Sequence, residues 1–122
     1  MTANEHTSQT LTDTVNWHLA ARVEDFPENG GACVYVEGKQ IAVFNFSARN
    51  EWYACQNMCP HKQQMILSRG MIGSQAEEPK VACPFHKKTF SLSTGKSLNG
   101  DTCDIDTYPI RVEEGVVYIG LS

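Results

Sequence analysis

Residues 32–36 read Ala-Cys-Val-Tyr-Val and residues 40–46 read Gln-Ile-Ala-Val-Phe-Asn-Phe, with Glu37-Gly38-Lys39 between them. Both stretches are rich in β-branched and aromatic residues, and the first alternates in character from residue to residue. Two such runs on either side of a short Gly-containing segment are typical of a β-hairpin. We therefore predict two antiparallel strands over residues 32–46.

The same pattern of short strands continues on both sides of this hairpin. Turn-forming residues recur between the segments, as at Pro27 to Gly31 and at Thr94-Gly95, and no segment keeps a helical period over three turns. The further strands that we expect are residues 17–21, 51–55, 80–83, 88–93, 108–112 and 116–121, the last two joined across residues 113–115. Many short strands separated by turns predict an all-β sandwich or barrel.

One long stretch, residues 56–79, shows neither a strand period nor a convincing helix, although Gln63 to Ser68 could form a single turn. An irregular segment of this length is uncommon in a compact domain unless it has its own organising element. Cys59-Pro60-His61 lies near its start, and Cys83-Pro84-Phe85-His86 lies just after its end. Each motif offers one thiol and one imidazole, so the pair of motifs is a candidate metal site.

Two metals fit the set Cys59, His61, Cys83 and His86. Zinc accepts two cysteines and two histidines, but its usual half-sites pair like with like and have at least two residues between the ligands. Here both half-sites are mixed, and one has a single intervening residue. A [2Fe–2S] cluster with two thiolates on one iron and two imidazoles on the other explains the mixing, because each loop then sends one ligand to each iron. We favour the cluster.

Other interpretations of the same residues stay open. An all-cysteine cluster from Cys55, Cys59, Cys83 and Cys103 is conceivable, but it leaves both histidines unexplained. The plainest alternative is two buried thiols and two surface histidines that hold no metal.

The remaining cysteines and histidines have simpler explanations. We expect Cys33, Cys55 and Cys103 to be small buried hydrophobic residues. His18 follows Trp17 in a strand, where packing or solvent contact is expected rather than ligation. No nucleophile–base pair, phosphate loop or pair of carboxylates stands out, so we expect the chain alone not to be catalytic.

Composition narrows the class of protein. The 122 residues include 14 acidic and 10 basic side chains, and a net charge of −4 argues against nucleic acid as a partner. The longest apolar run, residues 115–121, is too short to span a membrane. Five cysteines, an odd number, without a visible export signal predict reduced thiols and a cytoplasmic protein. Residues 1–15 contain five threonines and predict a mobile polar tail before one domain, residues 16–122.

Over residues 17–122 the sequence resembles the Rieske family of [2Fe–2S] proteins. Two segments, residues 67–73 and residues 81–95, together with the hairpin at residues 112–117, make it most similar to the small subunits of bacterial assimilatory NAD(P)H-dependent nitrite reductases. The resemblance implies an all-β Rieske-like domain with two cluster-binding loops. By the same resemblance, the cluster ligands are expected at Cys59, His61, Cys83 and His86.

The resemblance also implies a function and a partner. It implies a cytoplasmic oxidoreductase subunit that works with a large subunit bearing flavin, sirohaem and a [4Fe–4S] cluster, in an enzyme that reduces nitrite to ammonium during nitrate assimilation. One alternative is a free Rieske ferredoxin that donates electrons to an aromatic-ring oxygenase. A second alternative is a cluster-free structural or binding subunit of the reductase, because some relatives lack the ligands.

The sequence departs from the usual Rieske pattern in two ways. Gln63 and Lys87 stand where that pattern has glycines. The gap between His61 and Cys83 is longer than usual, and we assign the excess to a polar insertion at Ser74 to Pro79. Lysines at positions 62, 87 and 88 flank the ligands, either as a solvated face or as a cationic rim that docks an acidic partner.

Overall fold

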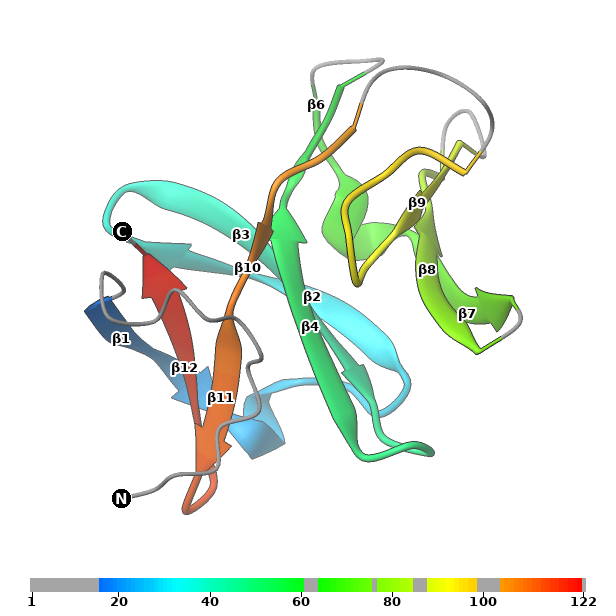
Figure 1. Ribbon diagram of the computed structural model, residues 1–122. Coiled ribbons are helices and arrows are strands. Elements are labelled where there is room, and N and C mark those ends of the chain that lie inside the picture. The colour runs from blue at the N-terminus through cyan, green and yellow to red at the C-terminus, as the bar shows by residue number, and fades with distance from the viewer. Residues whose placement is uncertain (1–15, 61–63, 76, 85–87, 99–103, 122) are drawn as a thin grey trace.

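The computed structural model describes residues 16–60, 64–75, 77–84, 88–98 and 104–121 (Figure 1). Within these ranges the regular structure consists of twelve strands and two 3₁₀ turns, η2 (Val23–Asp25) and η3 (Leu67–Arg69). The strands are β1 (Asn16–Arg22), β2 (Gly30–Val36), β3 (Lys39–Phe46), β4 (Glu51–Gln56), β5 (Met58–Cys59), β6 (Gln64–Met65), β7 (Met71–Gln75), β8 (Glu78–Ala82), β9 (Thr89–Ser91), β10 (Thr107–Tyr108), β11 (Ile110–Glu113) and β12 (Val116–Leu121). Every strand pair is antiparallel, so the predicted all-β class is confirmed.

Two predictions concerned the N-terminal segment and membrane-spanning helices. The predicted polar tail, residues 1–15, lies outside the described residues. Among the described elements, none is a helix that is long and apolar enough to cross a membrane.

Two sheets form the part of the molecule that we call the base. One sheet has the order β1-β12-β11 and the other has the order β10-β4-β3-β2. Ile41 and Val43 of β3 pack with Val117 and Ile119 of β12 in the apolar core between the sheets, and all four are fully buried. The predicted hairpin over residues 32–46 is confirmed as β2 and β3, whose register pairs Val36 with Lys39.

Strand β3 is buried on both of its faces. Ile41 and Val43 belong to the base core, whereas Ala42 and Phe44 belong to a second core on the opposite side of the sheet. Because successive side chains of a strand point to opposite faces, two covered faces produce the unbroken buried run from Ile41 to Phe46.

The second core lies under the part that we call the cap, which consists of the β5-β6 hairpin, η3 and the sheet β7-β8-β9. Val81 of β8, Phe90 of β9 and Leu67 of η3 are fully buried in this core against Ala42 and Phe44. Figure 1 shows the cap and the sheet of β1, β12 and β11 on opposite sides of the central sheet. The molecule therefore has two cores that share the central sheet.

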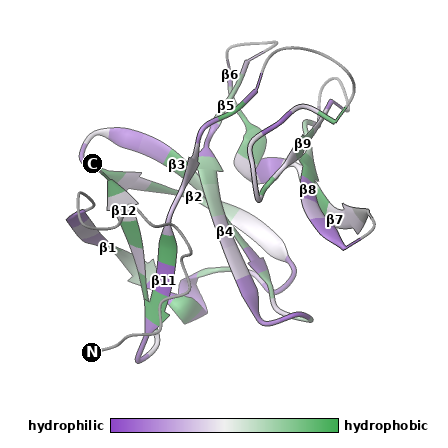
Figure 2. Cartoon of the chain, viewed as in Figure 1, coloured by the Kyte–Doolittle hydropathy of each residue, from purple (hydrophilic) through white to green (hydrophobic). Residues whose placement is uncertain are grey.

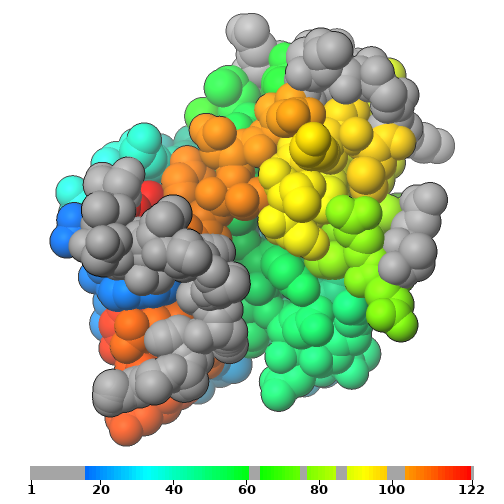
Figure 3. All heavy atoms as spheres, in the orientation of Figure 1, coloured from blue at the N-terminus to red at the C-terminus, as the bar shows by residue number. Residues whose placement is uncertain are grey.

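The segments that follow β9 join the cap to the base. The backbone N–H of Ile105 donates to the carbonyl of Gly95 at 2.8 Å, and Figure 3 shows residues 88–98 packed beside residues 104–108 on one face. Gly95 has a φ of +83°, and a Cβ there would collide with the Ile105 carbonyl oxygen. Glycine at this position therefore permits the contact.

Hydropathy follows this architecture. In Figure 2 the strand β12 is coloured mostly hydrophobic, and the turn between β2 and β3 is coloured hydrophilic. Apolar residues thus lie on strands with a covered face, and polar residues gather where the chain turns in solvent.

One prediction for the cap is wrong. Residues 56–79 were expected to be irregular, but Met71–Gln75 forms β7 and pairs with β8. Ser74 pairs with Pro79 and Gln75 pairs with Glu78, so the segment that we assigned to a polar insertion forms the end of a hairpin. The sequence pattern did not indicate this hairpin for two reasons. Strand β7 contains Gly73 and polar residues, and its partner β8 also pairs with β9 along its other edge.

A second prediction needs correction near Pro109. The expected strand over residues 108–112 is two strands, β10 and β11, which belong to different sheets. Tyr108 pairs with Ala54 of β4, whereas Ile110 pairs with Ile119 of β12. Proline lacks a backbone N–H and cannot continue a ladder on that side, so Pro109 is where the chain changes sheets. The hairpin of residues 110–113 and 116–121 is confirmed.

Candidate metal centre

The first motif lies at the tip of a two-stranded hairpin. Cys59 is the last residue of β5 and pairs with Gln64 of β6, which closes the loop of residues 60–63. Gln56, at the end of β4, supports this hairpin, because its side-chain Nε2 donates to the Met58 carbonyl at 2.7 Å. The Gln56 Oε1 in turn accepts a hydrogen bond from the backbone N–H of Asp106 at 2.8 Å. Cys59 is therefore anchored to the base.

The second motif also lies at the tip of a hairpin. Ala82 of β8 pairs with Thr89 of β9, and the backbone N–H of Cys83 donates to the Lys88 carbonyl at 2.8 Å. This bond closes the loop of residues 84–87. In both loops a cysteine stands at the first closing position, a proline follows it, and the same number of residues lies inside the closure.

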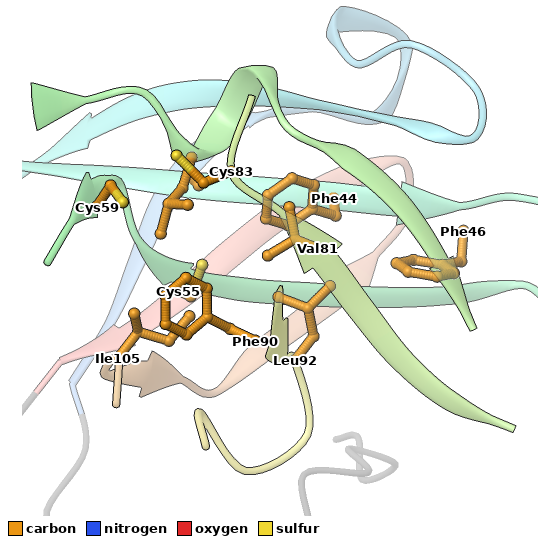
Figure 4. Close-up of a cluster of buried hydrophobic side chains, with 11 residues drawn as sticks. Phe44, Phe46, Cys55, Cys59, Val81, Cys83, Phe90, Leu92 and Ile105 are labelled. Atoms are coloured by element: carbon orange, nitrogen blue, oxygen red, sulfur yellow. The ribbon is translucent and has the colours of Figure 1, made fainter. Parts of the chain in front are cut away.

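The structure brings the two cysteines to one place. Cys59 and Cys83 are both fully buried, and both belong to the core under the cap. Figure 4 shows them, with Cys55, at one end of this core, while Phe46 lies at the other end. Two thiols from separate hairpins therefore lie at the same end of one core.

Cys55 belongs to the same core but has a different environment. It lies within β4, paired with Ala42 on one side and with Thr107 on the other, and it is fully buried. Burial raises the pKa of the Cys55 thiol well above its usual range. The fully buried position of Cys55 confirms the prediction that it is a small buried residue.

The two histidines, His61 and His86, lie outside the described residues, as do Lys62, Lys87 and Cys103. Within the described ranges, no three His, Cys, Asp or Glu side chains gather as a metal site requires. The all-cysteine alternative also depends on Cys103, which lies outside the described residues. His18 makes a 3.5 Å contact from Nδ1 to Glu37 Oε2 rather than a metal-like cluster.

The described residues fit a [2Fe–2S] cluster on two counts. Cys59 and Cys83 supply two thiols in one core. The surrounding side chains, among them Leu67, Phe90 and Ile105, are apolar and buried. Such a shell keeps water from the two thiols and lowers the local dielectric.

Two residues in this region differ from expectation. Cys33 was predicted to be buried, but it is exposed, because β2 is the edge of the central sheet and the cap does not extend over its side chain. Asn57 was not singled out, yet it is one of three buried polar or charged residues among the described ranges. The signal that could have found it is its place in the sequence, just after the predicted strand of residues 51–55 and two positions before Cys59.

The comparisons with known proteins place this architecture in a family. The chain belongs to the Rieske-like [2Fe–2S] domain family, which matches residues 16–120. It is 30% identical over 103 residues to a nitrite reductase (NADH) small subunit from Salmonella typhimurium, an alignment that covers 84% of this chain and 95% of that protein. A solved structure of a putative NADH-dependent nitrite reductase small subunit from Mycobacterium tuberculosis superposes with a TM-score of 0.82 at 25% identity, covering 88% of this chain and 96% of that one.

Other relatives differ in function and in length. The chain is 38% identical over 101 residues to the ferredoxin component of naphthalene 1,2-dioxygenase/salicylate 5-hydroxylase systems from Ralstonia sp., covering 82% of this chain and 90% of that protein. It also matches larger nitrite reductases from Klebsiella oxytoca and Emericella nidulans, but it spans 11% of their length. The resemblance to the Rieske family expected from the sequence is confirmed.

Proposed function

We propose that this chain is the small subunit of an NAD(P)H-dependent nitrite reductase and holds a [2Fe–2S] cluster through Cys59, His61, Cys83 and His86. The observation that carries the proposal is the meeting of Cys59 and Cys83, both fully buried, at one end of a single core. The similarity to nitrite reductase small subunits over nearly their whole length supports it. Nitrite would be reduced to ammonium for nitrate assimilation, in the cytoplasm, by the assembled enzyme rather than by this chain alone.

When bound, such a cluster accepts and donates one electron at a time. The residues of this chain contribute to that chemistry through their charges and through where they lie. Cys59 and Cys83 supply two negative charges that offset the charge of the irons, and the neutral imidazoles of His61 and His86 would complete the set without adding charge. The β5-β6 and β8-β9 hairpins hold the two cysteines, and the apolar core behind them excludes water.

The proposed partner is a large reductase subunit that carries flavin, sirohaem and a [4Fe–4S] cluster. A stretch of the Klebsiella oxytoca nitrite reductase large subunit aligns with 85% of this chain. A segment similar to this chain therefore occurs within a nitrite reductase subunit, which supports the proposed partner. Nucleic acid and membranes are not proposed as partners.

Iron and acid-labile sulfide content of the anaerobically purified chain tests the cluster. The matched pair of variants is Cys59→Ser against Cys55→Ala, because both cysteines are fully buried in one core and only Cys59 is a proposed ligand. We expect wild type and Cys55→Ala to bind two irons per chain and Cys59→Ser to bind none. Loss of iron in Cys55→Ala as well as in Cys59→Ser would favour the all-cysteine site, and a colourless wild-type protein would favour a cluster-free structural subunit.

A free ferredoxin that serves an aromatic-ring oxygenase is the second candidate. The 38% identity to the Ralstonia ferredoxin component favours it, since this value exceeds the identity to the Salmonella typhimurium small subunit. Affinity purification of the tagged chain from its own cells separates the two. Recovery of a sirohaem-containing partner supports the nitrite reductase, and recovery of the chain alone, with electron transfer to an oxygenase, supports the ferredoxin.

A further inference from the structure

Asn57 stands between β4 and β5, two positions before Cys59. Its relative exposure is 2%, and it lies where the chain leaves the central sheet to form the first ligand loop. A buried polar side chain is costly unless its hydrogen bonds are made. The partners of Asn57 therefore indicate what it is for.

Three consecutive backbone N–H groups donate to Asn57. Its carbonyl oxygen accepts from Ile66 and from Leu67, each at 2.9 Å, and its side-chain Oδ1 accepts from Ser68 at 2.7 Å. These bonds join residue 57 to residues 66–68 and so bring together the two ends of residues 58–65. That segment contains Cys59 and His61, the first half of the proposed ligand set.

The same residue ties this closed loop to the base. The backbone N–H of Asn57 donates to the Gln40 carbonyl at 3.3 Å. Its side-chain Nδ2 donates to Gln40 Oε1 at 3.1 Å and approaches Cys33 Sγ at 3.5 Å. The side chain thus uses its acceptor toward the cap and its donor toward β2 and β3.

This arrangement requires an amide at residue 57. The 3₁₀ turn η3 begins at Leu67, and the residue before it, Ile66, makes no side-chain cap. Asn57 supplies the missing acceptor for Ser68 from 11 positions upstream. An alanine would remove the side-chain acceptor of the half-buried Ser68 N–H and one of two donors to Gln40 Oε1, the other being the Cys33 thiol, whereas an aspartate would keep the acceptor toward Ser68.

We infer that Asn57 is a positioning residue that clamps the first ligand loop and thereby fixes Cys59 for cluster binding. The link to cluster binding rests on the proposed function, but the hydrogen bonds of Asn57 form in the chain without metal. Loss of its side-chain bonds to Ser68 and Gln40 loosens the segment around Cys59 locally, while the rest of the same core, with Cys55 and Val81, stays closed.

Site-resolved alkylation of the metal-free protein, read by mass spectrometry, tests the clamp. In Asn57→Ala we expect Cys59 to react at least about tenfold faster than in wild type, which corresponds to 1.4 kcal/mol, with little change at Cys55. Asn57→Asp should stay closer to wild type, because it keeps the acceptor for Ser68. Cys55 is the internal control, since global unfolding exposes both thiols together.

Val117→Ala is the matched variant, because it removes buried atoms from the base core and touches no bond of the clamp. It should raise the alkylation rates of Cys59 and Cys55 in parallel. If Asn57→Ala does the same, Asn57 contributes only general stability and the inference is overturned.

The iron-loaded protein gives an independent readout. Asn57→Ala should change the electron paramagnetic resonance g values and the reduction potential of the cluster, Asn57→Asp should largely restore them, and Val117→Ala should leave them unchanged. Identical spectra and potentials in all variants would overturn the positioning role. Wild-type protein that binds no iron would overturn the proposed function instead, and the alkylation ratios would still decide whether the clamp exists.

Discussion

The base and the cap are built by different means. The longest strand of the base, β3, has 8 residues, and its successive apolar side chains are buried in the two cores in turn. Strands of the cap are as short as the 2 residues of β5, and single polar side chains hold their ends. Asn57 closes the first loop, and Ser91 Oγ accepts from the N–H groups of Ser93 and Thr94.

This difference shows which sequence features determine the structure of the base and which determine the structure of the cap. Apolar alternation over six or more residues is enough to select a strand and its face. A two-residue strand has no such pattern, so its geometry depends on individual hydrogen bonds and, in the proposed function, on metal ligands. The predictions below separate these two sources of order.

The largest expected effect is at Cys83. Cys83→Ser removes a thiolate ligand, so we expect complete loss of iron, while the base keeps its strands because its core lies on the far side of β3. Iron analysis and far-ultraviolet circular dichroism measure the two outcomes. An unfolded variant would mean that metal binding supplies folding energy to the base as well as to the cap.

The next effect in size is at Phe44, which is fully buried in the core under the cap. Phe44→Ala should lower the free energy of unfolding by about 3–5 kcal/mol, measured by denaturant titration. Tyr35→Ala is the control, since Tyr35 is 68% exposed on the neighbouring strand, and it should change stability by about 0.5 kcal/mol or less. Two separate transitions in the Phe44 variant would show that the halves unfold independently.

Two glycines in the left-handed region sharpen the comparison. Gly38 in the base has a φ of +79° and open space around it, whereas Gly95 in the cap faces the Ile105 carbonyl. Gly38→Ala should cost about 1–2 kcal/mol from backbone strain alone, and Gly95→Ala should cost about 1–3 kcal/mol more because of the collision. Equal losses in thermal unfolding would mean that residue 105 moves away freely.

A smaller effect concerns alkaline pH. Burial, and then the hydrogen bond that Tyr53 Oη donates to Glu51 at 2.8 Å, raise the pKa of Tyr53 from 10.0 to about 12. The folded state then holds this proton more tightly than the unfolded state, so its contribution is complete below pH 10 and is lost as pH rises toward 12.

We therefore expect wild type to lose more stability than Tyr53→Phe between those two pH values. Denaturant titrations at a series of pH values measure the difference. Tyr108, whose pKa is also raised by burial, leaves a residual slope in the variant. Parallel slopes in the two proteins would contradict the role of Tyr53.

The smallest expected effect is at the N-terminus. Residues 1–15 have Leu11 as the only large aliphatic side chain before Val15, so the tail has little to bury. Deletion of residues 2–14 should leave the melting temperature within a few degrees, since changes at surface positions stay within about 0.5 kcal/mol. A fall of about ten degrees, well beyond that range, would show that the tail packs on the domain.

Prediction from sequence succeeded where structure is local. The hairpin of β2 and β3 and the hairpin of β11 and β12 were readable because alternation and turn residues lie side by side along the chain. The motifs around Cys59 and Cys83 were readable because each is short. Cys59 and Cys83 lie in one buried core, while the ligand roles of all four residues stay a prediction.

Prediction failed where a residue acts through distant partners. Asn57 looked like an ordinary residue at a strand end, because its bonds go to residues 66–68 and to Gln40. The exposure of the Cys33 side chain was not predicted, because how far the cap covers the central sheet depends on tertiary packing. The sheet change at Pro109 needed knowledge of two partners, Ala54 and Ile119, that lie far away in sequence.

The shared position of β3 has a consequence for the modularity of this protein. Since Ile41 and Val43 complete one core while Ala42 and Phe44 complete the other, neither half has a full interior without that strand. The cap cannot be excised as an autonomous minidomain, and grafting its two loops onto another scaffold would require a donor sheet that is apolar on both sides.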